Sequence, residues 1–174
     1  MQFLLSKSNS ENYHIYETAR SELPKLLDIN NAAVPAVNFL DLYQLEDLYA
    51  KSRYFFSVSV KTELAGFVVA LRDNSSYRSV NYRWFNTRYS RFLYIDRIII
   101  VPQFQHCGIG HLLYNCLTQA EQNYSEMLLC EVNLRPKNTP SLRFHEKYGF
   151  QQVGAQTTED GAKEVAMLGY RIHN

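Results

Sequence analysis

The sequence of 174 residues has few of the features that mark disulfide-rich, metal-binding or membrane proteins. Its three cysteines, Cys107, Cys116 and Cys130, are odd in number and match no Cys-x-x-Cys spacing, so neither a disulfide framework nor a metal site is expected. A reducing cytoplasm is the simplest location for such thiols. The first ten residues lack the apolar core of a signal peptide, and no apolar run is long enough to span a bilayer, so no membrane partner is expected.

An excess of charge of one sign is also lacking. Lysine and arginine number 18 against 17 aspartates and glutamates, and a formal net charge of +1 gives no global attraction for nucleic acid. Hydrophobic residues make up 46% and charged residues 20%, which is typical of a globular protein. No repeat or linker divides the chain, so residues 1–174 are expected to form one domain.

Hydrophobic spacing and turn signals predict the secondary structure. A short helix is expected to begin at Thr139-Pro140, with Thr139 as the N-cap, and to end at Gly149. The other helices are expected over 22–31 and 41–51 and from Ile109 onward. The strands are expected over 54–60, 64–71, 92–101, 127–132, 150–158 and 163–172, the last two forming a hairpin around Asp160-Gly161. This order predicts an α/β (α+β) fold, with one sheet covered by helices on both faces.

The segment between the strand that ends near Val101 and the helix that begins at Ile109 has the strongest functional signal. Gly108 and Gly110 allow a tight turn and a close approach of the backbone to a ligand. The first N–H groups of the helix lack helical partners, and with the helix dipole they favour an anion such as pyrophosphate. The spacing matches neither a Walker loop nor a dinucleotide-binding loop. A purely structural turn is the alternative interpretation.

The run Gln105-His-Cys-Gly108-Ile-Gly110 resembles the Gln/Arg-x-x-Gly-x-Gly/Ala loop of the GNAT superfamily of N-acetyltransferases. Downstream, Asn138 followed by Phe144-His-Glu-Lys-Tyr-Gly-Phe150 is similar to a second feature of that family, an asparagine before a short helix. The resemblance covers roughly residues 53–172. It implies the acyl-CoA N-acyltransferase fold, with a mixed central sheet of about six to seven strands.

The resemblance also implies acetyl-CoA as cosubstrate and two strands, ending near Val101 and Val132, that separate to admit it. Pantetheine would pair with the backbone of the first strand, pyrophosphate would lie on the loop amides, and an asparagine would contact the pantetheine arm. A backbone N–H near Ile100 would stabilise the oxyanion. The residues expected to bind the cofactor are therefore Ile98, Ile99, Ile100, Gln105, His106, Cys107, Gly108, Ile109, Gly110 and Asn138.

Two side chains are the candidates for acid–base catalysis. Glu131-Val132 is similar to a Glu-Val pair in ribosomal-protein N-terminal alanine acetyltransferases, and burial can raise the pKa of Glu131 toward that of a base at neutral pH. A structural, ion-paired carboxylate is the alternative. His145 stands where the family usually has the tyrosine that protonates the departing thiolate, and an imidazolium can do the same. Otherwise His145 is a packed residue, and Tyr148 or water supplies the proton.

Residues 72–97 are rich in arginine and aromatic side chains. Such a segment can bind nucleic acid, can form the wall of an acceptor site, or can simply pack on its own domain. In the family it often shapes the acceptor pocket, so Asp96, Tyr82 and Trp84 are the expected substrate-binding residues. A structural ion pair is the alternative for Asp96.

The leading hypothesis is therefore transfer of the acetyl group of acetyl-CoA to a primary amine, by direct attack in a ternary complex. A small-molecule amine and a protein amino terminus are both open as acceptors, and no nucleic acid is expected as a partner. A non-catalytic module that binds or senses acyl-CoA is the alternative. The oligomeric state is also open, with a homodimer among the options.

Overall fold

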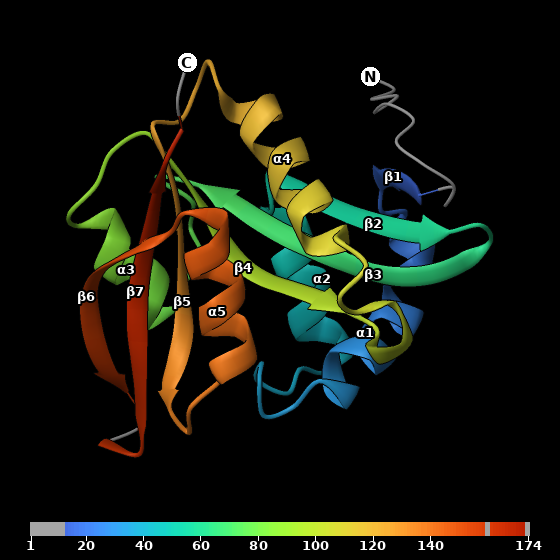
Figure 1. The fold of residues 1–174 in the computed structure, drawn as a ribbon, viewed down its shortest axis with the longest axis horizontal. Coiled ribbons are helices and arrows are strands. Elements are labelled where there is room, and N and C mark those ends of the chain that lie inside the picture. The colour runs from blue at the N-terminus through green and yellow to red at the C-terminus, as the bar shows by residue number, and fades with distance from the viewer. Residues whose placement is uncertain (1–12, 159–160, 173–174) are drawn as a thin grey trace. The chain divides into compact units, whose positions relative to one another are not determined.

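The computed structural model describes residues 13–158 and 161–172 (Figure 1). They belong to two compact parts, each built from two segments of chain. The first part comprises Met1–Ala70 with Arg97–Gln119, and the second comprises Leu71–Asp96 with Ala120–Asn174. The prediction of a single domain over the whole chain stays a prediction.

The described residues form seven strands, which are hydrogen-bonded in the order β1-β2-β3-β4-β5-β7-β6. The strands are β1 (Tyr13–Glu17), β2 (Tyr54–Val60), β3 (Glu63–Arg72), β4 (Phe92–Ile100), β5 (Met127–Arg135), β6 (Gln151–Thr158) and β7 (Lys163–Arg171). The helices are α1 (Leu23–Ala32), α2 (Leu42–Lys51), α3 (Val80–Asn86), α4 (Ile109–Glu121) and α5 (Thr139–Tyr148), with the short 3-10 helices η1 (Arg20–Glu22) and η2 (Pro102–Phe104).

In the first part, antiparallel pairing joins β1 to β2 and β2 to β3. Helices α1 and α2 lie behind these strands in Figure 1, and α4 lies in front of them. A close backbone contact joins β3 to the end of β4, because a Cβ at Gly66 would lie 2.3 Å from the carbonyl oxygen of Ile99. Buried Arg97 of β4 donates hydrogen bonds to Asn30 of α1 and to Asn38, which fixes the chain between α1 and α2.

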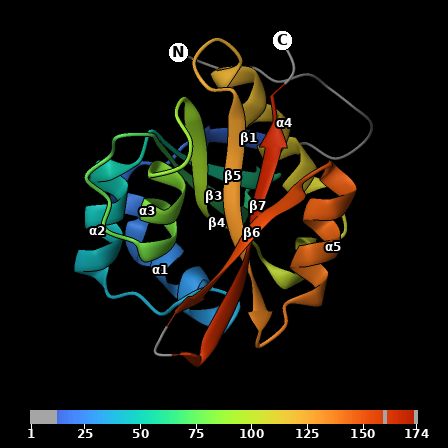
Figure 2. The same cartoon turned by 90° about the vertical axis from the view of Figure 1, so that its left-hand side faces the viewer.

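In the second part, β4 and β5 run parallel from Phe92↔Met127 to Tyr94↔Leu129, and β7 pairs antiparallel with both β5 and β6. This register places Tyr94, Leu129 and Gly169 on one face and Tyr170 on the other. The ring of Tyr82 in α3 packs on β4, whereas the rings of Tyr148 in α5 and of Phe150 pack on Tyr170 of β7. Helices α3 and α5 therefore cover opposite faces, as Figure 2 also shows.

The sequence-based fold class is confirmed by this mixed sheet with helices on both faces. The strand predicted over 54–60 has those bounds, and the other predicted elements agree within a few residues at each end. Strand β1 and helix α3 were missed. The predicted N-cap of α5 was wrong: the side chain of Asn138, not Thr139, accepts a hydrogen bond from the amide of Ser141.

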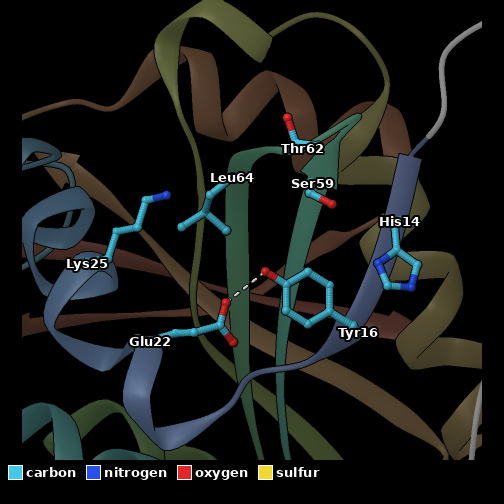
Figure 3. Close-up of a pocket in the computed structure, with 7 residues that line it drawn as sticks. All are labelled: His14, Tyr16, Glu22, Lys25, Ser59, Thr62 and Leu64. Carbon is cyan, nitrogen blue, oxygen red and sulfur yellow. Dashed lines mark hydrogen bonds between the residues drawn. The ribbon is translucent and has the colours of Figure 1, made fainter.

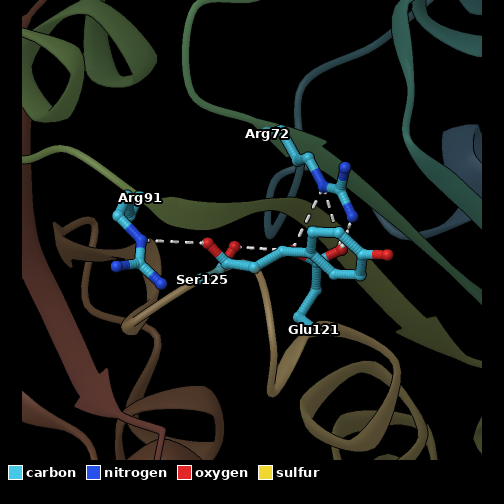
Figure 4. Close-up of polar contacts among 5 residues, drawn as sticks. Arg72, Arg91, Glu121 and Ser125 are labelled. Atoms are coloured by element: carbon cyan, nitrogen blue, oxygen red, sulfur yellow. Dashed lines mark hydrogen bonds and ion pairs between the residues drawn. The ribbon is translucent and has the colours of Figure 1, made fainter.

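A buried ion pair joins β3 to the end of α4 in the second part. Arg72 donates to Glu121 through Nε at 3.0 Å and through Nη2 at 2.7 Å, and Ser125 donates its hydroxyl proton to the same carboxylate (Figure 4). The Glu121 side chain is fully buried, and the Arg72 guanidinium also lies over the ring of Tyr124. A nearby pair, Arg91–Glu126, is more than half exposed at both ends.

Replacing Glu121 by alanine should lower the free energy of unfolding by about 3 kcal/mol, because it leaves the Arg72 guanidinium without its carboxylate. The matched control, Glu126→Ala, should cost at most about 1 kcal/mol, because its partner is solvated. Urea unfolding followed by circular dichroism measures both. Equal losses in the two variants would contradict the assignment of the first pair as the structural one.

Candidate active site

The loop after β4 combines an exposed backbone with positive φ angles. His106 has a φ of 64° and Gly108 a φ of 81°, and residues 105–108 are exposed. The Gln105 side chain donates to the carbonyl of Ile100 at 2.9 Å, which ties the loop to the strand end. The Leu112 amide donates to the Gly108 carbonyl at 3.1 Å, which is the first hydrogen bond of helical type in α4. The amides just before Leu112 therefore lie at the helix N-terminus, where they have no helical acceptor.

This geometry fits an acidic ligand such as the pyrophosphate of a coenzyme. A Cβ added at Gly108 would meet no heavy atom within 4 Å, so the space beside this residue is open. The positive φ favours glycine there on backbone grounds, while the N-terminal amides of α4 and the helix dipole attract negative charge. Of the other predicted cofactor residues in this segment, Ile99 and Ile109 are buried and Gly110 is partly exposed. The backbone carbonyl of Cys107 accepts a hydrogen bond from the Tyr13 hydroxyl.

Glu131 lies in a polar cluster on the α3 face of β5. The hydroxyl of Tyr94 lies 3.0 Å from Oε1 and 2.8 Å from Oε2 of its carboxylate, and Asn81 of α3 donates to Oε1 at 2.9 Å. Gln156 of β6 in turn donates to the side-chain oxygen of Asn81 at 2.6 Å. Three secondary-structure elements, β4, β5 and α3, thus meet at one carboxylate, and β6 is linked to it through Asn81.

Burial, followed by the neighbouring Asp96 carboxylate, raises the pKa of Glu131 to about 7. The hydrogen bonds from Asn81 and Tyr94 and the charge of Lys163 act in the opposite direction, and burial prevails. Burial also raises the pKa of Tyr94 well above its ordinary value, so this tyrosine remains a hydrogen-bond donor to Glu131. The cluster therefore holds a carboxyl group that gains and loses its proton near neutral pH.

The predicted substrate-binding residues have different environments. Asp96 accepts a hydrogen bond from Tyr77 at 2.6 Å and influences Glu131 electrostatically. Tyr82 is buried, and its hydroxyl donates to the carbonyl of Arg72, so it organises the segment before α3. Trp84 packs against β6, where a Cβ at Gly154 would lie 2.6 Å from the indole. Of the three, only Asp96 has an electrostatic effect on the Glu131 carboxylate in the described structure.

His145 is 97% buried on α5, and its ring lies in edge-to-face contact with Phe144 and Phe150. Its Nδ1 lies 2.7 Å from the carbonyl oxygen of Ser141, and because a carbonyl can only accept, Nδ1 carries a proton. Burial lowers the pKa of His145 to about 4. The imidazolium expected from the sequence is therefore a minor species at neutral pH, which favours the alternative of a packed, hydrogen-bonded residue.

Asn138 is the N-cap of α5. Its side-chain oxygen accepts from the Ser141 amide at 3.2 Å, and its own amide donates to the carbonyl of Asn133. The expected contact with a pantetheine arm would therefore come from the side-chain NH₂ group, since the oxygen is occupied.

Sequence reasoning missed Tyr94, Asn81, Gln156 and Tyr77. Strand alternation could have found Tyr94, because it lies two positions before Asp96 on the same strand. No sequence signal links Asn81 to Gln156, since 75 positions separate them.

A pocket of about 350 Å³ in the first part is lined by none of the predicted site residues (Figure 3). Its lining includes Tyr16, which donates to Glu22 at 2.9 Å, and burial with this bond raises the pKa of Tyr16 to about 12. The hydroxyl thus stays protonated and joins β1 to η1.

Among the described residues, no three potential ligand side chains gather as a metal site, and no helix is long and apolar enough to cross a membrane.

Comparison with known proteins gives consistent results. A family profile described as an acetyltransferase (GNAT) domain matches residues 28–168. An N-alpha-acetyltransferase of Sulfurisphaera tokodaii is 22% identical over 153 residues, which are 88% of each chain. The structure of Ard1 from Thermoplasma volcanium is similar with a TM-score of 0.74 at 17% identity, over 93% of this chain and 99% of that one. The yncA structure from Salmonella typhimurium, solved with its cofactor acetyl-CoA, has a TM-score of 0.68 at 15% identity, over 94% and 95%.

The family profile defines the class of protein, an acetyltransferase, and the open glycine loop at a helix N-terminus is consistent with a coenzyme that carries phosphate. Because the family profile spans most of the chain, the protein belongs to the GNAT acetyltransferase family, whose members use acetyl-CoA. The resemblance inferred from the two sequence motifs is thereby confirmed.

Gly108→Ala should weaken acetyl-CoA binding by about tenfold or more, because the new Cβ enters the open space beside the loop amides. Isothermal titration calorimetry measures the dissociation constant. Gly161→Ala is the matched control: its φ is +95° and a Cβ there also meets nothing within 4 Å. Both variants should lose about 1–2 kcal/mol of stability from backbone strain, and equal affinities in both would contradict a pyrophosphate site at Gly108.

Proposed function

We propose that the chain transfers the acetyl group of acetyl-CoA to the α-amine of a polypeptide, by direct attack in a ternary complex. The observation that carries the proposal is the Glu131 carboxyl group, with its pKa of about 7 and its hydrogen bonds from Tyr94 and Asn81. An α-amine is favoured over a small-molecule amine because the similar Sulfurisphaera protein is named an N-alpha-acetyltransferase.

Glu131 acts as the general base. An α-amine has a pKa of about 8, so at neutral pH it arrives mainly as an ammonium ion, which cannot attack a carbonyl. The ionised carboxylate takes one proton from this ammonium group, directly or through a water molecule, and leaves the nitrogen lone pair available. Asp96, held by Tyr77, adds a second negative charge that attracts the ammonium ion.

Acetyl-CoA supplies the thioester carbonyl that the amine attacks. The amides at the start of α4, with Gly108, would hold its pyrophosphate, and the backbone of Ile98–Ile100 would pair with its pantetheine. The NH₂ group of Asn138 would donate to the same arm. A backbone N–H near Ile100 would stabilise the negative charge that develops on the carbonyl oxygen.

His145 supports α5 in this proposal rather than donating a proton. Its neutral ring has its Nδ1 proton directed to the Ser141 carbonyl, so it holds no spare proton at neutral pH. The nitrogen loses its second proton as the C–S bond breaks, and this proton reaches the departing thiolate through water or Tyr148, the two routes that the sequence left open beside the histidine.

Glu131→Gln should lower kcat by about 10²–10⁴-fold, the usual contribution of a general base, while the acetyl-CoA dissociation constant stays unchanged. Release of CoA thiol with an N-terminal peptide as acceptor measures the rate. In the wild type, kcat should rise with pH through about 7, because the base acts only when ionised, and this limb should disappear in the variant. Turnover equal to that of the wild type would exclude the proposed base.

His145→Phe should retain kcat within a few-fold, because phenylalanine keeps the edge-to-face contacts with Phe144 and Phe150. It should lose about 1 kcal/mol of stability with the hydrogen bond to Ser141. The same CoA-release assay and thermal unfolding provide the two measurements. A fall in kcat of about 10²-fold or more would instead restore the proton-donor role that the sequence suggested.

A further inference from the structure

Two side-chain amides form a chain that ends on the Glu131 carboxylate. Gln156 Nε2 donates to Asn81 Oδ1 at 2.6 Å, and Asn81 Nδ2 donates to Glu131 Oε1 at 2.9 Å. Asn81 is the second residue of α3, and Gln156 lies on β6, so the chain joins two elements distant in sequence to the catalytic strand β5.

The direction of this chain is fixed by its chemistry. An ionised carboxylate can only accept, so the NH₂ group of Asn81 faces Glu131, the Asn81 oxygen faces Gln156, and Gln156 presents its own NH₂ group. The opposite rotamer of Asn81 would place two acceptors together at Glu131. The Gln156 donor then holds Asn81 in the orientation that suits the carboxylate.

Each oxygen of Glu131 has a donor in the described hydrogen bonds. Asn81 donates to Oε1, and the Tyr94 hydroxyl lies closer to Oε2, at 2.8 Å, than to Oε1, at 3.0 Å. Two donors from different elements therefore fix the plane of the carboxyl group, and they favour its ionised form because they donate to it.

Helix α3 is itself held firmly on this face. The Tyr82 hydroxyl accepts from the Ser75 amide and donates to the Arg72 carbonyl, and Trp84 packs on β6 at Gly154. From the segment just before α3, Tyr77 donates to Asp96. One stretch of chain thus supplies a hydrogen-bond donor to each of the two neighbouring carboxylates.

We propose that Asn81 and Gln156 are positioning residues, which hold the Glu131 carboxylate in one orientation and favour its ionised form, so that it can receive the proton of the acceptor amine. This inference rests on the proposed role of Glu131 as base. The amides act only through that carboxylate and touch neither substrate nor cofactor. The titratable groups around Glu131 are Asp96 and Tyr94 on β4, Tyr77 before α3, and Lys163 on β7.

The test is the pH dependence of two substitutions at Asn81. Asn81→Ala removes a donor to the ionised carboxylate, so the acid limb of kcat should move upward by about one pH unit. The maximal kcat should fall by roughly tenfold or more, because the carboxyl group is free to rotate. In Asn81→Asp the side chain keeps its shape but places an oxygen, rather than an NH₂ group, beside Oε1. The acid limb of its kcat profile should therefore move further upward in pH than that of Asn81→Ala.

Asn86→Ala is the matched control. Asn86 lies on the same helix, and its side-chain oxygen accepts from the Asn74 amide, so its loss loosens the segment without removing a donor to Glu131. The acid limb of its kcat profile should match that of the wild type.

Gln156→Leu should shift the acid limb of kcat in the same direction as Asn81→Ala, but by less, because Asn81 remains and loses only its fixed orientation.

A second readout needs no turnover. In protein labelled with ¹³C at glutamate carboxyl groups, NMR titration follows Glu131 directly, and the Glu131→Gln variant assigns its signal. The midpoint should rise in both Asn81 variants and stay unchanged in Asn86→Ala. Unchanged midpoints and pH profiles in both Asn81 variants would overturn the inference, as would equal shifts in Asn86→Ala. If Glu131→Gln keeps full turnover, the proposed base fails instead, whatever the Asn81 variants do.

Discussion

The withdrawal of the Glu131 carboxyl group from bulk water is the constraint on which the catalytic proposal depends. Desolvation raises its pKa to about 7, and Asp96 acts in the same direction. Without enough hydrogen bonds such a group would be costly to bury, and Tyr94 and Asn81 meet that requirement. The same contacts that make the buried group tolerable also fix its position, so stability and chemistry have a common origin here.

The aromatic and polar residues of the 72–97 segment serve this constraint. Tyr82 and Phe85 anchor α3 on β4, and their burial places Asn81 beside β5. Tyr77 and Asn81 then each bind one carboxylate. Of the three interpretations that the sequence left open for this segment, packing on its own domain is what the structure displays, and the packing positions the site.

Much of the fold could be predicted because its signals are local. The β-branched runs of β2 and β4 and the amphipathic stripe of α4 specify their own conformations, and the Gly108 loop and the Asn138 helix carry family motifs. Helix α3 was missed because it is short and its aromatic residues were interpreted as part of an irregular segment rich in arginine. The N-cap of α5 was misplaced by one residue, since Asn138 and Thr139 are both good capping residues and only the backbone decides between them.

The sequence by itself determined most of the strands and helices, the glycine loop and the family, because these depend on neighbouring residues. The tertiary structure decided the ionisation of the site. Glu131 and His145 each have an ordinary pKa in an unfolded chain, and burial moves them in opposite directions, to about 7 and about 4. Desolvation favours the neutral form of each group, so the carboxyl group holds its proton to a higher pH and the imidazole stays uncharged. No local pattern encodes that burial, because it is produced by residues distant in the chain.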